Sequence, residues 1–171
     1  AKAALRFLAA RAEDYHIDTE RIFIAGNSSG GHIALMTAFT ESQGIFDTPL
    51  YQETPCRIKG VIAQSAPSNI MKCAKEPLPP GFPENFRPTR DLLGVKEVLE
   101  SPELAEAASC GKYISQAAEL PPVLLFHGID DVQVSVEHSR ELFALLKGAG
   151  KDAAYYEIEG GGHGGAVFWT D

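Results

Sequence analysis

The sequence lacks the features by which nucleic-acid-binding and membrane-spanning proteins are usually recognised. Its 171 residues carry 15 Lys and Arg against 23 Asp and Glu, a formal net charge of -8, and they contain no run of basic residues. Such a chain has little with which to neutralise a phosphate backbone or an anionic lipid surface. No apolar run approaches the roughly 18 residues that a transmembrane helix needs. We therefore expect no nucleic-acid partner and no membrane span.

Cysteine is also scarce. Cys56, Cys73 and Cys110 lie far apart, without the short Cys or His spacings that are typical of zinc sites. An odd, sparse count favours free thiols in a reducing compartment, which predicts a cytoplasmic protein, and a Cys56–Cys73 disulfide is the alternative for a secreted one. We expect each cysteine to be a small buried apolar residue, and we expect neither a metal nor an organic cofactor.

What is present is the composition and patterning of a folded α/β protein. Apolar residues make up 44% of the chain and charged residues 22%, which fits one globular domain over 1–171. Short apolar runs predict buried strands at 21–25, 59–67, 122–128 and 153–160, and helical patterns occupy 1–14, the segment after Gly31, and 136–147. This alternation predicts a mostly parallel sheet with helices on both faces.

A longer segment at about 69–117 separates the second and third predicted strands. It contains the proline-dense stretch KEPLPPGFPENFRPTRDLLG, and proline removes the N–H groups that a sheet requires. An excursion of this length from the carboxyl end of a strand commonly builds the wall or lid of an active site. A structural loop that covers the edge of the sheet is the alternative.

The first candidate catalytic motif is the stretch Gly26-Asn27-Ser28-Ser29-Gly30, at the junction of a predicted strand and a predicted helix. It fits the G-x-S-x-G nucleophile elbow, in which the central serine occupies a strained turn, so its register selects Ser28 as the nucleophile. The backbone N–H of Ser29 would then donate to an oxyanion. A plain glycine-rich turn or a phosphate cradle is the alternative, although the lysine and glycine spacings of phosphate-binding loops are missing.

A serine nucleophile needs a histidine base and a carboxylate that orients the base. His163 stands in the glycine-rich stretch EGGGHGGAVF after the last predicted strand, and Asp130 and Asp131 follow the third. Loops at the carboxyl ends of parallel strands meet at one edge of a sheet, so Ser28, Asp131 and His163 would converge there. Other roles are expected for the remaining histidines: surface positions for His16 and His138, packing for His32, and a structural role for His127.

Three motifs together resemble the α/β-hydrolase fold serine esterases, and more narrowly their feruloyl esterase-like, acetyl-esterase and lipase branch. GNSSGGH from Gly26, HGIDDVQVS from His127 and GGGH from Gly160 are similar to the elbow, aspartate and histidine motifs of that branch, in the same order. The resemblance implies a Ser28–His163–Asp131 triad, with Asp130 as a loop residue. Ser135 stands where the branch usually has proline, and its hydroxyl can cap the following helix.

Some features that the resemblance leads us to expect are missing from this sequence. The branch carries an H-G-G-type oxyanion loop upstream of the nucleophile, and neither that loop nor the first strands of the sheet precede Ser28 here. Loss of one oxyanion donor costs on the order of 3 kcal/mol in transition-state stabilisation. We therefore expect residues 1–171 to be the C-terminal part of a longer hydrolase, ending at Asp171 within what would be the last helix, and to be nearly inactive alone.

The expected function is that of a serine carboxylic-ester hydrolase that forms an acyl-enzyme. The resemblance implies small-molecule substrates with short acyl groups, including acetyl or aromatic acyl esters of sugars, and a pocket to which Phe82 and Phe86 contribute. A serine peptidase of the prolyl oligopeptidase type and an arylformamidase are the alternatives among hydrolases. A non-catalytic binding protein with the hydrolase fold is the alternative from another class.

Overall fold

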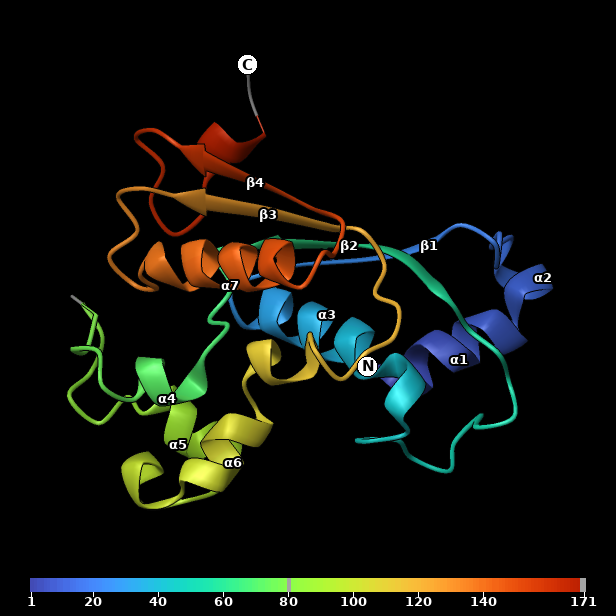
Figure 1. Cartoon of the computed structure of the whole chain (residues 1–171), viewed down its shortest axis with the longest axis horizontal. Helices are drawn as coiled ribbons and strands as arrows, with labels where there is room; N and C mark the ends of the chain where they lie inside the picture. The colour runs from blue at the N-terminus through green and yellow to red at the C-terminus, as the bar shows by residue number, and fades with distance from the viewer. Residues whose placement is uncertain (80, 170–171) are drawn as a thin grey trace.

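The computed structural model describes residues 1–79 and 81–169, and a parallel sheet of four strands forms its centre (Figure 1). The strands are β1 (Ile22–Asn27), β2 (Ile58–Gln64), β3 (Val123–Gly128) and β4 (Ala153–Ile158), in the spatial order β1-β2-β3-β4. Every neighbouring pair is parallel. The predicted α/β class is therefore confirmed, and each strand lies within a few residues of its predicted position.

Two longer helices pack on the sheet: α3 (Ser29–Phe39) against β1 and β2, and α7 (Glu137–Gly148) against β3 and β4. The first predicted helix is divided at Arg11 into α1 (Lys2–Ala10) and α2 (Ala12–Tyr15), and His16 ends α2 in the left-handed conformation at φ 54°. The short elements are η1 (Glu41–Gln43), α4 (Ile70–Cys73), α5 (Pro88–Leu93), η2 (Val98–Glu100), α6 (Pro102–Ala107), η3 (Cys110–Tyr113) and η4 (Ala166–Phe168).

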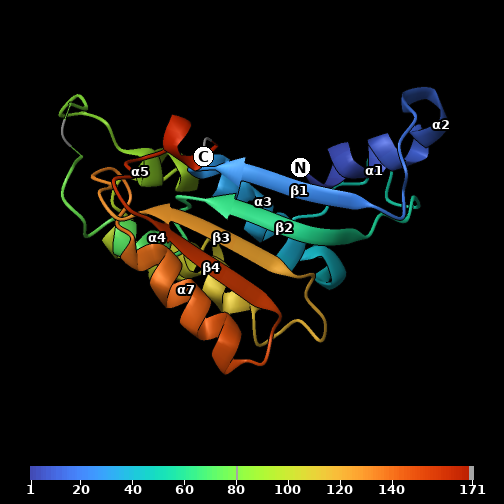
Figure 2. The ribbon, with the colours of Figure 1, turned by 90° about the horizontal axis from the view of Figure 1, so that it is seen from above.

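The helices that pack on the sheet in the described residues cover one face of it rather than both. Figure 1 shows α3 and α7 on the same side, and Figure 2 shows the opposite face in front of them. Each strand lies next to the strand that precedes it in the chain, and connections between parallel strands are right-handed. All the connections therefore lie on the same face of the sheet. On the opposite face Phe23 is 61% exposed and Tyr156 56% exposed.

The main core lies between the sheet and its two helices. Its largest side chains are all but inaccessible to solvent: Leu35, Phe39, Val61, Leu125, Leu142 and Leu146. Burial of a side chain of this size contributes about 1.5–3 kcal/mol relative to exposure. This core holds the carboxyl ends of the strands in place, and the loops that follow those ends carry the candidate catalytic residues.

The segment at 69–117 folds into short helices with a small core of its own, formed by Ile70, Val98 and Ala105, while its last part contributes Cys110, Tyr113 and Ile114 to the main core. It lies beside the helical layer below the carboxyl ends of the strands (Figure 1), so it is a helical insertion rather than a loop along the sheet edge. Pro80 within it lies outside the described residues, as does Asp171, and the described residues near the expected last helix form only the short η4. In the described part of the chain, no helix is long and apolar enough to cross a membrane.

Candidate active site

Ser28 occupies a strained turn between β1 and α3. Its backbone has φ 56° and ψ -124°, a combination that is costly for any residue with a side chain. The turn is held from both sides, because the Ser28 N–H donates to the carbonyl of Gln64 at 2.8 Å and the Ser28 carbonyl accepts from His32 N–H at 3.1 Å. The structure therefore contains the sharp strand-to-helix turn that the glycine and serine pattern predicted.

The glycines around this turn are not equivalent. A Cβ atom on Gly26 would lie 2.2 Å from the carbonyl carbon of Gly30, and one on Gly31 would lie 2.9 Å from the Cβ of Ala66. A Cβ on Gly30 would meet nothing within 4 Å. Close packing thus requires glycine at positions 26 and 31. At position 30 a Cβ atom would meet no steric conflict.

This difference predicts opposite outcomes for two alanine substitutions. Gly26→Ala forces a backbone shift at the start of α3 that no side-chain rotation can relieve, and we expect it to lower the free energy of unfolding by more than about 3 kcal/mol. Gly30→Ala should leave stability within about 0.5 kcal/mol of the wild type. Urea denaturation of both variants measures the difference. Equal stability of the two would contradict the packing that the structure gives this turn.

His163 lies beside Ser28 and Asp131 lies beside His163, as the convergence of strand ends predicted. His163 Nε2 is 2.8 Å from Ser28 Oγ, and His163 Nδ1 is 2.8 Å from Asp131 Oδ2. A carboxylate accepts, so the Nδ1–H donates to Asp131, which leaves Nε2 free to accept the hydroxyl proton of Ser28. This is the tautomer that a general base next to a serine requires.

The His163 loop reaches Ser28 because glycines allow it to approach the end of β3. A Cβ on Gly128 would lie 2.1 Å from the carbonyl oxygen of Gly161, which shows how closely the two backbones pass. Gly164 has φ 99° and Gly165 φ 104°, conformations that residues with a side chain rarely adopt. The glycine-rich stretch is therefore a close-packed turn that places His163 at the site.

Asp131 is held in one orientation by a full set of donors. Its side chain is buried, and its Oδ1 accepts from the N–H groups of Gln133 and Val134, both at 2.9 Å. Its Oδ2 lies 3.2 Å from His127 Nε2 in addition to its contact with His163. Burial raises the pKa of Asp131, but the hydrogen bonds from both histidines and both backbone groups outweigh it and hold the pKa far below its usual range. The group is an oriented carboxylate at neutral pH.

His127 has the structural role that the sequence predicted. It is fully buried, with Nδ1 2.7 Å from Ser139 Oγ and Nε2 2.9 Å from the carbonyl of Val134. These contacts connect β3 to α7 and fix the loop that carries Asp131. His32 is likewise a packing residue: its Nε2–H donates to the carbonyl of Ala108 at 2.8 Å and so joins α3 to the insertion.

His138 is buried, and its predicted surface position is therefore wrong. Its ring is inaccessible to solvent. The ring contacts residues of the insertion that lie in α4 and on either side of it. Nδ1 is 3.4 Å from the N–H of Asn69, and Nε2 is 3.4 Å from Cys73 Sγ and 3.2 Å from Glu76 Oε2. Burial lowers the pKa of His138. The residues next to His138 in the sequence are mostly polar, which is typical of an exposed helix. The sequence of α7 therefore gives no sign that the insertion covers His138.

The other sequence predictions for single residues are confirmed in part. Asp130 and His16 are exposed. Ser135 does not cap α7, because the helix has Val136 at its N-cap and no side-chain cap hydrogen bond; the Ser135 hydroxyl instead accepts from the N–H of Glu137 at 3.3 Å, in the turn before the helix. All three cysteines are free, as expected, but only Cys110 is buried; Cys56 and Cys73 are partly exposed, so the buried position expected for these two is wrong.

A cavity of about 670 Å³ lies in front of Ser28 and His163, and its far wall belongs to the insertion. Apolar residues supply most of that wall: Ile70, Pro77, Leu78, Phe82, Phe86, Pro88 and Leu92. Phe82 and Phe86 stack with ring centroids 4.5 Å apart. Ser29 also lines the cavity at the first position of α3, where backbone N–H groups have no acceptor within the helix.

A parallel sheet with a strained serine turn after β1, and a histidine and an aspartate in the loops after β4 and β3, defines the α/β-hydrolase class. The family model described as BD-FAE matches residues 1–146, and the chain belongs to this family.

Curated relatives and solved structures agree with this class. The probable isoprenylcysteine alpha-carbonyl methylesterase ICMEL1 of Arabidopsis thaliana is 26% identical over 171 residues, which cover 95% of this chain and 34% of the relative. The probable carboxylic ester hydrolase LipM of Mycobacterium tuberculosis is 24% identical, with 91% and 34% covered. This chain thus spans about a third of these relatives. A solved truncated form of a carbohydrate esterase from gut microbiota superposes with a TM-score of 0.83 at 27% identity, covering 99% of this chain and 61% of that one.

Proposed function

We propose that the protein is a serine carboxylic-ester hydrolase with Ser28 as nucleophile, His163 as general base and acid, and Asp131 as the group that orients His163. The observation that carries this proposal is the continuous hydrogen-bonded chain from Ser28 Oγ through His163 to Asp131, with 2.8 Å at each step. Membership of the BD-FAE family and the ester-hydrolase names of the relatives support it.

In the proposed reaction Ser28 Oγ attacks the acyl carbon while His163 Nε2 takes the hydroxyl proton. The negative charge that develops on the carbonyl oxygen is stabilised by the N–H of Ser29, which the helix leaves unpaired. When the tetrahedral intermediate collapses, His163 returns the proton to the leaving alcohol and the acyl group stays on Ser28. Water then attacks the acyl carbon while His163 takes one of its protons, and His163 returns that proton to Ser28 Oγ as the bond to the acyl group breaks and the acid leaves. Asp131 stabilises the imidazolium at both stages without becoming protonated.

The cavity supports small esters as substrates. Its wall is largely apolar and its stacked Phe82 and Phe86 offer a flat surface to an acyl group or a sugar ring. A carbohydrate esterase among the structural relatives supports esters of sugars within this class. We propose short acyl esters, including those of carbohydrates, as the substrates of the whole protein.

Labelling with a fluorophosphonate tests the proposal most directly, because this probe reacts with a serine only when a base activates it. With the protein at its full natural length, we expect one adduct, located at Ser28 by peptide mapping, and its formation should abolish hydrolysis of p-nitrophenyl acetate. An unlabelled Ser28 in a folded protein would favour the non-catalytic binding alternative. Turnover of aminoacyl amides in preference to esters would favour the peptidase alternative.

A further inference from the structure

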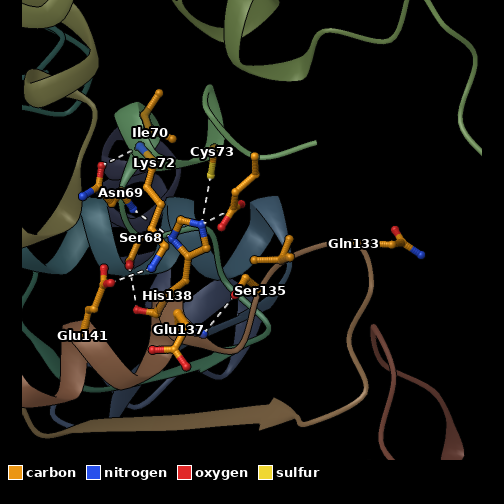
Figure 3. Close-up of polar contacts among 12 residues, drawn as sticks. Ser68, Asn69, Ile70, Lys72, Cys73, Gln133, Ser135, Glu137, His138 and Glu141 are labelled. Atoms are coloured by element: carbon orange, nitrogen blue, oxygen red, sulfur yellow. Dashed lines mark hydrogen bonds and ion pairs between the residues drawn. The ribbon is translucent and has the colours of Figure 1, made fainter. Parts of the chain in front are cut away.

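A second group of reactive side chains lies beside the same cavity, outside the proposed triad. Cys73 ends α4, Glu76 follows it by three residues, and the ring of His138 on α7 faces both. Figure 3 shows Cys73 and the ring of His138 pointing toward each other across the gap between the two helices. We call Cys73, Glu76 and His138 the thiol cluster. Cys73 and Glu76 line the cavity.

The two distances from His138 Nε2 to the other donor atoms are close to the edges of a coordination tetrahedron. Cys73 Sγ is 3.4 Å from His138 Nε2, which in turn is 3.2 Å from Glu76 Oε2, and all three ligand atoms lie within 4.8 Å of one another. Bond lengths of about 2.3 Å for Zn–S and about 2.0–2.1 Å for Zn–N and Zn–O place tetrahedral neighbours roughly 3.3–3.6 Å apart. One ion could therefore contact all three atoms with small side-chain adjustments.

We propose that the thiol cluster binds a divalent transition-metal ion of the zinc type through Cys73 Sγ, Glu76 Oε and His138 Nε2, with its fourth position open to the cavity. One sulfur, one nitrogen and one oxygen donor form a set that suits zinc and cobalt and excludes calcium and magnesium, which take oxygen ligands only. This site goes beyond the proposed ester hydrolysis and is independent of Ser28.

The charges of the cluster favour the ion once the thiol has lost its proton. On binding, the Cys73 S–H bond breaks, its proton leaves to solvent, and the sulfur electron pair forms the bond to the metal. A thiolate, a carboxylate and a dication sum to zero, so no net charge is buried. The neighbouring cation, Lys72, is paired with Glu141.

Two features of the site oppose binding and set its affinity. Burial raises the pKa of Cys73 to about 12, so removal of the thiol proton is expensive. A metal bound at Nε2 also requires the ring proton of His138 to sit on Nδ1. Nδ1 then can no longer accept the N–H of Asn69, so this 3.4 Å contact is lost. We therefore expect an exchangeable ion rather than a permanently held structural one.

Titration of the full-length, metal-free protein with Co²⁺ tests the site without reference to activity. We expect one equivalent to bind and to produce the near-ultraviolet charge-transfer band of a thiolate ligand together with the visible bands of a tetrahedral centre. Cys73→Ser should lose the charge-transfer band and weaken binding by more than about tenfold, the lower limit for disturbing even the groups around a metal ligand. Zn²⁺ should displace Co²⁺ and remove the spectrum.

Cys56→Ser is the matched control, because Cys56 is a free thiol outside the cluster, and it should keep both the band and the affinity. Glu76→Gln keeps the shape of its side chain and should weaken binding while the charge-transfer band survives at saturation. A folded wild-type protein with no thiolate band, or a Cys73→Ser variant that binds Co²⁺ as the wild type does, would overturn the proposal. Neither result bears on Ser28, whose labelling is measured separately.

Discussion

In the full-length protein, replacement of Ser28 by alanine is expected to lower kcat for p-nitrophenyl acetate by on the order of 10⁵- to 10⁶-fold. The substitution removes the oxygen that His163 Nε2 contacts at 2.8 Å, so no acyl-enzyme can form and water must attack directly. Alanine retains the Cβ atom and demands no more of the strained turn than serine does. Steady-state kinetics and a denaturation curve of the same sample separate lost chemistry from lost structure.

Ser29→Ala is the matched control for this experiment. The two serines are adjacent and both line the cavity, but the proposed contribution of Ser29 comes from its backbone N–H, which alanine keeps. We expect kcat within a few-fold of the wild type. Equal losses in the two variants would contradict the assignment of the nucleophile to Ser28.

A second large effect is expected at the aspartate. Asp131→Asn should reduce kcat by about 10⁴-fold, because the amide of asparagine can present an N–H where the carboxylate accepted one. The backbone donors of Gln133 and Val134 fix one side of the group at Oδ1, so its amide nitrogen would face His163 Nδ1. His163 then carries its proton on Nε2, where it cannot accept from Ser28.

Asp130→Asn tests whether the effect is local. Asp130 is exposed and next to Asp131 in sequence, so the variant changes the net charge equally and leaves the hydrogen bonds of the site intact. Its kcat should match that of the wild type. If Asp130→Asn instead showed the larger loss, the carboxylate would be assigned to the wrong residue.

Local patterns were sufficient to predict the strands and the meeting of three side chains. Each strand is a short apolar run bounded by turn residues, and its ends could be placed within a few positions. The approach of Ser28, Asp131 and His163 follows from geometry, because the carboxyl ends of parallel strands share an edge. The catalytic roles of the three residues remain the predictions that the experiments above test.

Contacts between distant segments could not be predicted in this way. The residues around His138 are mostly polar, which is typical of a solvent-facing helix turn, yet the insertion packs over the ring of His138. The thiol cluster was missed for the same reason, since Cys73 and His138 are 65 residues apart. The sequence also predicted helices on both faces of the sheet, whereas they cover one face in the described residues. Which face a helix covers depends on the strand order, and no local pattern specifies that order.

The separate core of the insertion affects how the specificity of this fold can change. Ile70, Val98 and Ala105 stabilise the segment that bears Phe82 and Phe86, whereas the strands and α3 that position Ser28 rest on a different set of buried side chains. Phe82 and Phe86 belong to neither set of buried side chains, so substitutions at these two positions reshape the apolar wall without removing a core residue. Substrate range can diverge among relatives while the reacting groups keep their geometry, and random mutagenesis confined to 77–92 should yield altered ester preferences at little loss of fold stability.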